Sequence, residues 1–143
     1  MSVLRSRWIE WVLILITLVG LGIDAYVHLH IASSYRLVRT SALSQADLFR
    51  VEAGLAILAG VWLVLRPSRL SAAFAFLVAV GGVAAVTFYY YVDPGQLGPI
   101  PDMYEPVWYP DKTKSLDGEA VAAVASFLVF ALQWRRSARK ARS

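Results

Sequence analysis

Hydrophobic and polar positions divide the chain into four long apolar stretches separated by short polar segments. The stretch at 70–92 contains no charged residue and is long enough to cross roughly 30 Å of hydrocarbon as a helix. The other three stretches contain isolated charged or histidine side chains, but each keeps an uncharged run of about a dozen residues or more. The pattern therefore predicts four membrane-spanning helices, at about 8–31, 47–65, 69–92 and 117–134.

Local signals support these boundaries. Ser44 followed by Asp47 is typical of a capping box at the start of the second helix. The segment 66–69, Arg-Pro-Ser-Arg, predicts a tight turn, so the second and third helices are expected to be antiparallel neighbours. Small residues at a spacing of four, such as Ala56 and Gly60, allow helices to approach closely.

Five of the six prolines lie between the third and fourth apolar stretches, together with several aromatic residues. Because proline restricts the backbone, this segment is expected to be an ordered outer loop over 93–116. The fold expected is therefore a single all-α membrane domain over 1–143. It is a four-helix transmembrane bundle with this loop between helices three and four and a basic cytoplasmic tail at 135–143.

Composition agrees with a membrane protein. Hydrophobic residues make up 58% of the chain and charged residues 17%, against about 45–50% and about 25% in an ordinary soluble domain. The chain has no cysteine, which excludes disulfides, zinc–thiolate sites, iron–sulfur clusters and thiol catalysis. No nucleotide-binding, zincin or hydrolase motif is present, so the sequence favours a non-enzymatic protein.

The basic residues are distributed unevenly over the two sides of the predicted bundle. Nine would lie on the side of the termini and five on the other, which predicts cytoplasmic N- and C-termini. Nucleic acid is not expected as a partner, because a basic segment beside a membrane helix is explained by attraction to anionic lipid. The partners expected are membrane lipids and other membrane subunits. The predicted lipid-facing anchors are Arg66, Arg69, Arg135, Arg136, Arg139 and Lys140.

Four ionisable residues are predicted to meet at one depth in the membrane. At about 1.5 Å per residue, Asp24, His28, Glu52 and Glu119 all lie roughly 20–25 Å from the inner boundary of their helices. Asp24 and His28 are four residues apart and share a helix face, whereas His30 points away. Buried carboxylates with a histidine suit a divalent ion such as Fe, Mn or Zn, so a metal ion is the cofactor considered.

Structural explanations of the same residues remain open. Arg50 would pair with Asp24 or Glu52, Glu119 would occupy the first turn of the fourth helix, and both histidines would be hydrated at the interface. In that case the protein is a purely structural membrane subunit.

A second functional alternative is a subunit of a membrane redox or proton-coupled enzyme that binds quinone in this pocket. The run Tyr89-Tyr90-Tyr91 and Trp108 would form its aromatic wall beside His28, and the residues Tyr104, Trp108 and Tyr109 would form a lid. The competing interpretation is an aromatic belt at the outer interface.

Three short segments are similar to segments of a known group of membrane proteins. They are 24–32 (Asp-Ala-Tyr-Val-His-Leu-His-Ile-Ala), 47–49 (Asp-Leu-Phe) and 98–101 (Gly-Pro-Ile-Pro). With them the chain resembles small actinobacterial four-span membrane proteins of unknown function. Its size and histidine-bearing outer face are distantly similar to DoxX-like proteins, which are linked to membrane redox complexes. The resemblance implies the four-span architecture and assigns no site residue.

Overall fold

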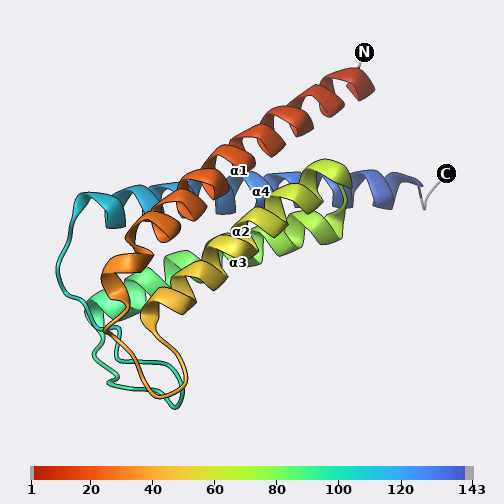
Figure 1. Ribbon diagram of the computed structural model, residues 1–143. Coiled ribbons are helices and arrows are strands. Elements are labelled where there is room, and N and C mark those ends of the chain that lie inside the picture. Colours follow the sequence, from red (N-terminus) through yellow and green to blue (C-terminus); the bar gives the residue numbers. More distant parts are fainter. Residues whose placement is uncertain (1, 141–143) are drawn as a thin grey trace.

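The computed structural model describes the chain over residues 2–140, and the surroundings of the side chains over 7–138. The four helices are α1 (Ser2–Ala32), α2 (Gln45–Leu65), α3 (Arg69–Tyr91) and α4 (Pro110–Lys140), and a 3-10 helix, η1 (Ser33–Tyr35), follows α1. In Figure 1 successive helices run in opposite directions. The start of α1, the α2–α3 turn and the end of α4 share one end of the bundle, called here the terminal end, and the two longer connections form the loop end.

The four helices form a ring in which each packs against its neighbours in sequence and α4 packs against α1. All four are long and apolar enough to cross a membrane. Large apolar side chains such as Leu58, Leu77 and Val124 are exposed on the outside of the bundle, whereas alanines fill much of its core. The chain is therefore a multi-pass membrane protein with a four-helix transmembrane bundle, as the hydropathy pattern predicts.

Side-chain caps begin the two central helices. The Ser44 hydroxyl accepts the backbone N–H of Asp47, and the Asp47 carboxylate accepts the backbone N–H of Ser44, which confirms the predicted capping box. Ser68 and Ser71 form a corresponding box at the start of α3, directly after Pro67. This short connection makes α2 and α3 antiparallel neighbours, as expected.

The predicted boundaries of the outer loop and the fourth helix were wrong. Helix α4 begins at Pro110 rather than at 117, so the loop covers 92–109 and not 93–116. Proline suits the first turn of a helix because its φ is already helical and its missing N–H needs no partner there. The hydropathy pattern did not predict this extension because residues 111–117 are mostly polar. Helix α4 also continues to Lys140, so most of the predicted tail is helical, and 141–143 lie outside the described residues.

Helices α1 and α4 approach most closely at two glycines. A Cβ added to Gly20 would lie 2.5 Å from the carbonyl oxygen of Gly118, and one added to Gly118 would lie 2.8 Å from that of Gly20. Both distances are shorter than a carbon–oxygen contact allows, so neither position accepts a side chain without moving a helix. One turn further toward the loop end, the same approach brings Asp24 of α1 against Ser115 and Glu119 of α4.

Candidate metal centre

The centre begins with two neighbouring side chains on α1. His28 and Asp24 are separated by four residues, so their side chains lie on one face of the helix. His28 Nδ1 is 2.8 Å from Asp24 Oδ1 and 3.1 Å from the Asp24 carbonyl oxygen. Asp24 is fully buried and His28 is 7% exposed. The pair is therefore held inside the bundle, as the shared face predicted, and away from the interface.

Helix α4 supplies the opposite side of the centre. The Ser115 hydroxyl lies 3.1 Å from Asp24 Oδ1 and 3.2 Å from Glu119 Oε1, within donating distance of both. A hydroxyl has a single hydrogen and satisfies only one of these carboxylates at a time. Ser115 thus links the two acids without meeting the full hydrogen-bonding capacity of either.

Three ligand atoms converge at this point. One atom from each of Asp24, His28 and Glu119 lies within 4.8 Å of the other two, and all three residues are buried. Among the described side chains, Asp24 Oδ2, Glu52 Oε1 and Glu119 Oε2 are buried oxygens that have no hydrogen-bond partner. Buried carboxylate oxygens without partners are costly, so these positions would be satisfied by a cation, by a hydrogen-bond donor or by a proton shared between two carboxyl groups.

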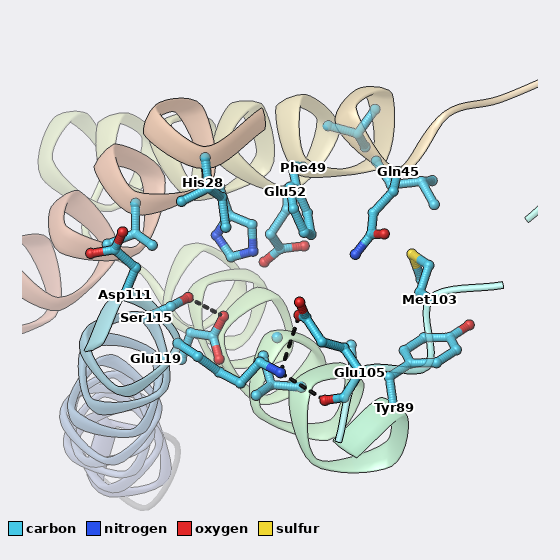
Figure 2. Close-up of a pocket in the computed structure, with 18 of the residues that line it drawn as sticks. His28, Gln45, Phe49, Glu52, Tyr89, Met103, Glu105, Asp111, Ser115 and Glu119 are labelled. Atoms are coloured by element: carbon cyan, nitrogen blue, oxygen red, sulfur yellow. Dashed lines mark hydrogen bonds and ion pairs between the residues drawn. The ribbon is translucent and has the colours of Figure 1, made fainter. Parts of the chain in front are cut away.

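Glu52 of α2 joins this cluster from the other side of a cavity. The cavity has a volume of about 360 Å³ and extends from the centre toward the loop end. Figure 2 shows His28 and Glu52 pointing from their helices toward Ser115 and Glu119 on α4. His28, Glu52, Ser115 and Glu119 line the cavity, and Asp24 contacts His28 and Ser115. The four sequence-predicted site residues thus lie around one end of the cavity, although Glu52 is not among the three residues whose ligand atoms lie within 4.8 Å of one another.

The loop end of the cavity is closed by a polar network around Glu105. Lys112 Nζ lies 3.2 Å from Glu105 Oε2 and donates to the carbonyl oxygens of Glu105 and Val107, at 2.9 and 2.8 Å. The Tyr35 hydroxyl donates to Glu105 Oε1 at 2.8 Å and lies 2.9 Å from the Tyr109 hydroxyl. Burial raises the pKa of the Tyr109 hydroxyl, which keeps it protonated as a donor to Glu105. The α3–α4 loop is thus ordered, as predicted.

The predicted aromatic pocket is only partly present. Tyr89 and Tyr109 line the cavity. Within the described part of the chain, the cavity lining does not include Tyr90, Tyr91, Tyr104 or Trp108. Tyr90 and Trp108 instead contact each other edge to face and lie near the Lys112 ammonium, while Tyr91 and Tyr104 are exposed. The predicted quinone wall and lid therefore do not form as a set.

The structural explanations expected for the polar cluster were wrong in their details. Arg50 pairs with Asp47 at 3.0 Å on the surface and with neither Asp24 nor Glu52. Glu119 lies well past the first turn, because α4 begins at Pro110. Of the two histidines, His30 is exposed and stacks on Tyr26, whereas His28 is buried.

A further buried acid, Glu10, which the sequence analysis did not single out, lies at the terminal end. The carboxylate of Glu10 on α1 accepts hydrogen bonds from Gln133 and Arg136 on α4. Arg136 is thus a partner for a protein side chain rather than a lipid-facing anchor alone. The sequence carries a signal for this pair, because a glutamate within an apolar stretch is expected to meet a basic residue at the same depth on another helix.

The remaining predicted anchors keep positions compatible with lipid headgroups. Arg66, Arg69 and Arg135 are exposed, and the Arg69 guanidinium lies 5.3 Å from the centre of the Trp134 ring. The side chains of Arg139 and Lys140 lie outside the part of the chain whose side chains are described.

Fold and centre together define a four-helix integral membrane protein with a buried carboxylate–histidine cluster. No protein-family model, curated protein or solved structure matches this chain.

Proposed function

We propose that this protein is a non-enzymatic integral membrane protein, an accessory subunit or binding module, that holds a divalent metal ion at Asp24, His28 and Glu119, with Glu52 nearby. The observation that carries the proposal is the convergence of one ligand atom from each of the first three residues within 4.8 Å. One imidazole with carboxylates suits Mn, Fe or Zn, which accept mixed nitrogen and oxygen ligands.

Charge compensation supports the same conclusion. Asp24, Glu52 and Glu119 bring three carboxylates to a buried region, against the single imidazole of His28. Lys112, the nearest lysine in the cavity lining, already binds Glu105 and two carbonyl oxygens. A divalent cation would balance most of this negative charge, and ionisable groups at membrane depth are retained where they perform such a role.

The proposed orientation places the loop end outside and both termini in the cytoplasm. Eight of the thirteen lysines and arginines within residues 2–140 belong to the terminal end, and positive residues near helix ends favour the cytoplasmic side. In this orientation the metal centre lies in the outer half of the membrane. Anionic lipid headgroups would contact Arg66, Arg69 and Arg135.

Quinone binding is the weaker candidate, since Tyr91 and Tyr104 are exposed and Trp108 bonds to Thr113 instead of facing the cavity. We therefore do not assign a redox role to the cavity.

The test compares metal content in paired variants. Protein purified in mild detergent is measured by elemental analysis, beside Glu119→Gln and its control Asp117→Asn, an exposed acid on the same helix. His28→Asn is paired in the same way with His30→Asn. We expect about one metal ion per chain in the wild type and both controls, and loss of the ion in Glu119→Gln and His28→Asn.

Chelation adds an independent reading, because a ligand that binds only the folded state raises the unfolding temperature. Removing the metal should lower the unfolding temperature of the wild type and leave that of Glu119→Gln unchanged. A wild-type protein that contains no metal and gains no stability from Mn, Fe or Zn would contradict the proposal. Together with an unchanged or more stable Glu119→Gln, that result would favour a purely structural cluster.

A further inference from the structure

The lining of the cavity beside the metal centre changes in character from one end to the other. At the metal-centre end, His28 and Glu52 on one side and Ser115 and Glu119 on the other form a polar wall. Toward the loop end, the lining includes apolar and aromatic side chains from α2, α3 and the α3–α4 loop, among them Phe49, Val86, Tyr89 and Met103, together with the polar side chains of Gln45, Glu105, Asp111 and Lys112. Such a combination, an apolar chamber with a few convergent polar groups at one end, is typical of sites for small amphiphilic ligands.

The polar wall offers acceptors and has few donors to satisfy them. Glu119 is 0% exposed and lines the cavity, and its Oε2 has no hydrogen-bond partner among the described residues. Glu52 also lines the cavity, and its Oε1 likewise has no hydrogen-bond partner among the described residues. Lys112 does not supply the missing charge, because its ammonium is bound to Glu105 and Val107. A ligand that fits this wall therefore carries hydrogen-bond donors and a positive charge.

The cavity lining also includes residues at the outside of the bundle. Val51 of α2 and Ala85 of α3 line the cavity and are exposed, and Val51 is 57% exposed. Both residues lie within helices that are long and apolar enough to cross a membrane, so this part of the lining would face lipid. At the loop end, Ile100, Met103 and Glu105 cover the cavity instead. A ligand dissolved in the bilayer would thus enter between α2 and α3.

We propose that the cavity binds a small lipophilic amine, with its ammonium group between Glu52 and Glu119 and its apolar body against Phe49 and Tyr89. An ammonium has three donors for these carboxylates and is attracted to aromatic faces. The volume of about 360 Å³ holds on the order of a dozen water-sized groups at roughly 30 Å³ each, which sets the size of the ligand. The site shares Glu119 with the metal centre, so an ammonium group and a metal ion would compete for that carboxylate, and amine binding does not depend on a bound metal.

Phenylbutylammonium and its neutral analogue phenylbutanol are suitable probes, because they match in size and differ in charge. Binding is measured by calorimetry on the full chain in phosphatidylcholine nanodiscs, with empty nanodiscs as the reference for partitioning into lipid. We expect the amine to bind about tenfold more tightly than the alcohol, and Glu52→Gln to remove most of that difference. Equal binding of the two probes would overturn the proposal.

A steric variant tests the location independently of charge. Val86→Trp fills the cavity, whereas Val80→Trp places the same ring on a position of α3 that is not part of the described lining. We expect amine binding to be lost in Val86→Trp and kept in Val80→Trp, and unchanged binding in Val86→Trp would overturn the assignment. A protein that takes up metal but binds no amine would contradict the amine site and leave the proposed metal centre standing. Amine binding by a protein that takes up no metal supports it and counts against the metal centre.

Discussion

Gly82 of α3 faces the carboxylate of Glu119 on α4 so closely that a Cβ at position 82 would overlap the Glu119 carboxyl group. The glycine thus leaves the space that the acid occupies between the two helices. Its neighbour Gly81 has no atom within 4 Å of the corresponding Cβ position and faces away from the bundle. The two adjacent glycines therefore have different roles, one in packing beside the centre and one on the surface.

Replacing Gly82 with alanine should displace the Glu119 carboxylate from Asp24 and His28. We expect metal affinity to fall by about tenfold or more, and stability to fall by ~1–3 kcal/mol because the site becomes overpacked. Gly81→Ala is the control and should be neutral or slightly stabilising, since alanine favours a helix over glycine by about 1 kcal/mol. Metal titration and thermal unfolding of both variants check this. Wild-type affinity in Gly82→Ala would show that the carboxylate position is not critical.

Hydropathy and helical rise were sufficient to predict the four spans and the common depth of Glu52, Glu119 and the Asp24–His28 pair. Depth follows from counting residues along a helix, so it is visible in one sequence. The partners Ser115 and Gly82 were not predictable in this way. They depend on how each helix is rotated about its axis, and alanine-rich faces give little periodic signal for that rotation.

The polar start of α4 was missed for a different reason. Residues 110–116 contain lysine and aspartate, so a hydropathy pattern assigns them to a loop although Pro110 is a favourable helix start. The loop expected over 93–116 therefore includes Lys112. In the structure Lys112 lies on α4 slightly less than one helical turn before Ser115, and it anchors the α3–α4 loop over the cavity.

Lys112 should be the main support of that loop. The Lys112 side chain is almost completely buried, and its ammonium meets the Glu105 carboxylate and two backbone carbonyls. Lys112→Met therefore removes the side-chain donor of both carbonyl oxygens and leaves the Glu105 carboxylate with Tyr35 and Tyr109 as its described donors. We expect faster hydrogen exchange in 92–109 and a loss of stability of about 1–3 kcal/mol. Lys114→Met, which removes an exposed lysine paired with Asp111, should change stability by less than about 1 kcal/mol. Similar exchange rates in the two variants would contradict this role for Lys112.

Arg136 is expected to stabilise the terminal end through Glu10. Because Glu10 is 5% exposed, Arg136→Ala would leave a buried carboxylate with Gln133 as its remaining described side-chain donor. We expect a loss of about 1–3 kcal/mol, below the ~3–5 kcal/mol of a fully buried pair because a third of the Arg136 side chain is exposed. Arg135→Ala, at an exposed neighbouring position, is the control. Thermal unfolding that ranks the two variants equally would exclude a special role for the pair.

Membrane orientation decides which compartment the centre and its loop face, and it is accessible through single cysteines because the chain has none of its own. Ala42→Cys marks the α1–α2 connection at the loop end, and Ala138→Cys marks the last turns of α4; both positions are exposed. With cytoplasmic termini, a membrane-impermeant maleimide should label Ala42→Cys in intact cells and Ala138→Cys only after the membrane is opened. The reverse pattern would invert the bundle. The metal centre would then lie in the inner half of the membrane, and any ion reaching it through the loop end would come from the cytoplasm.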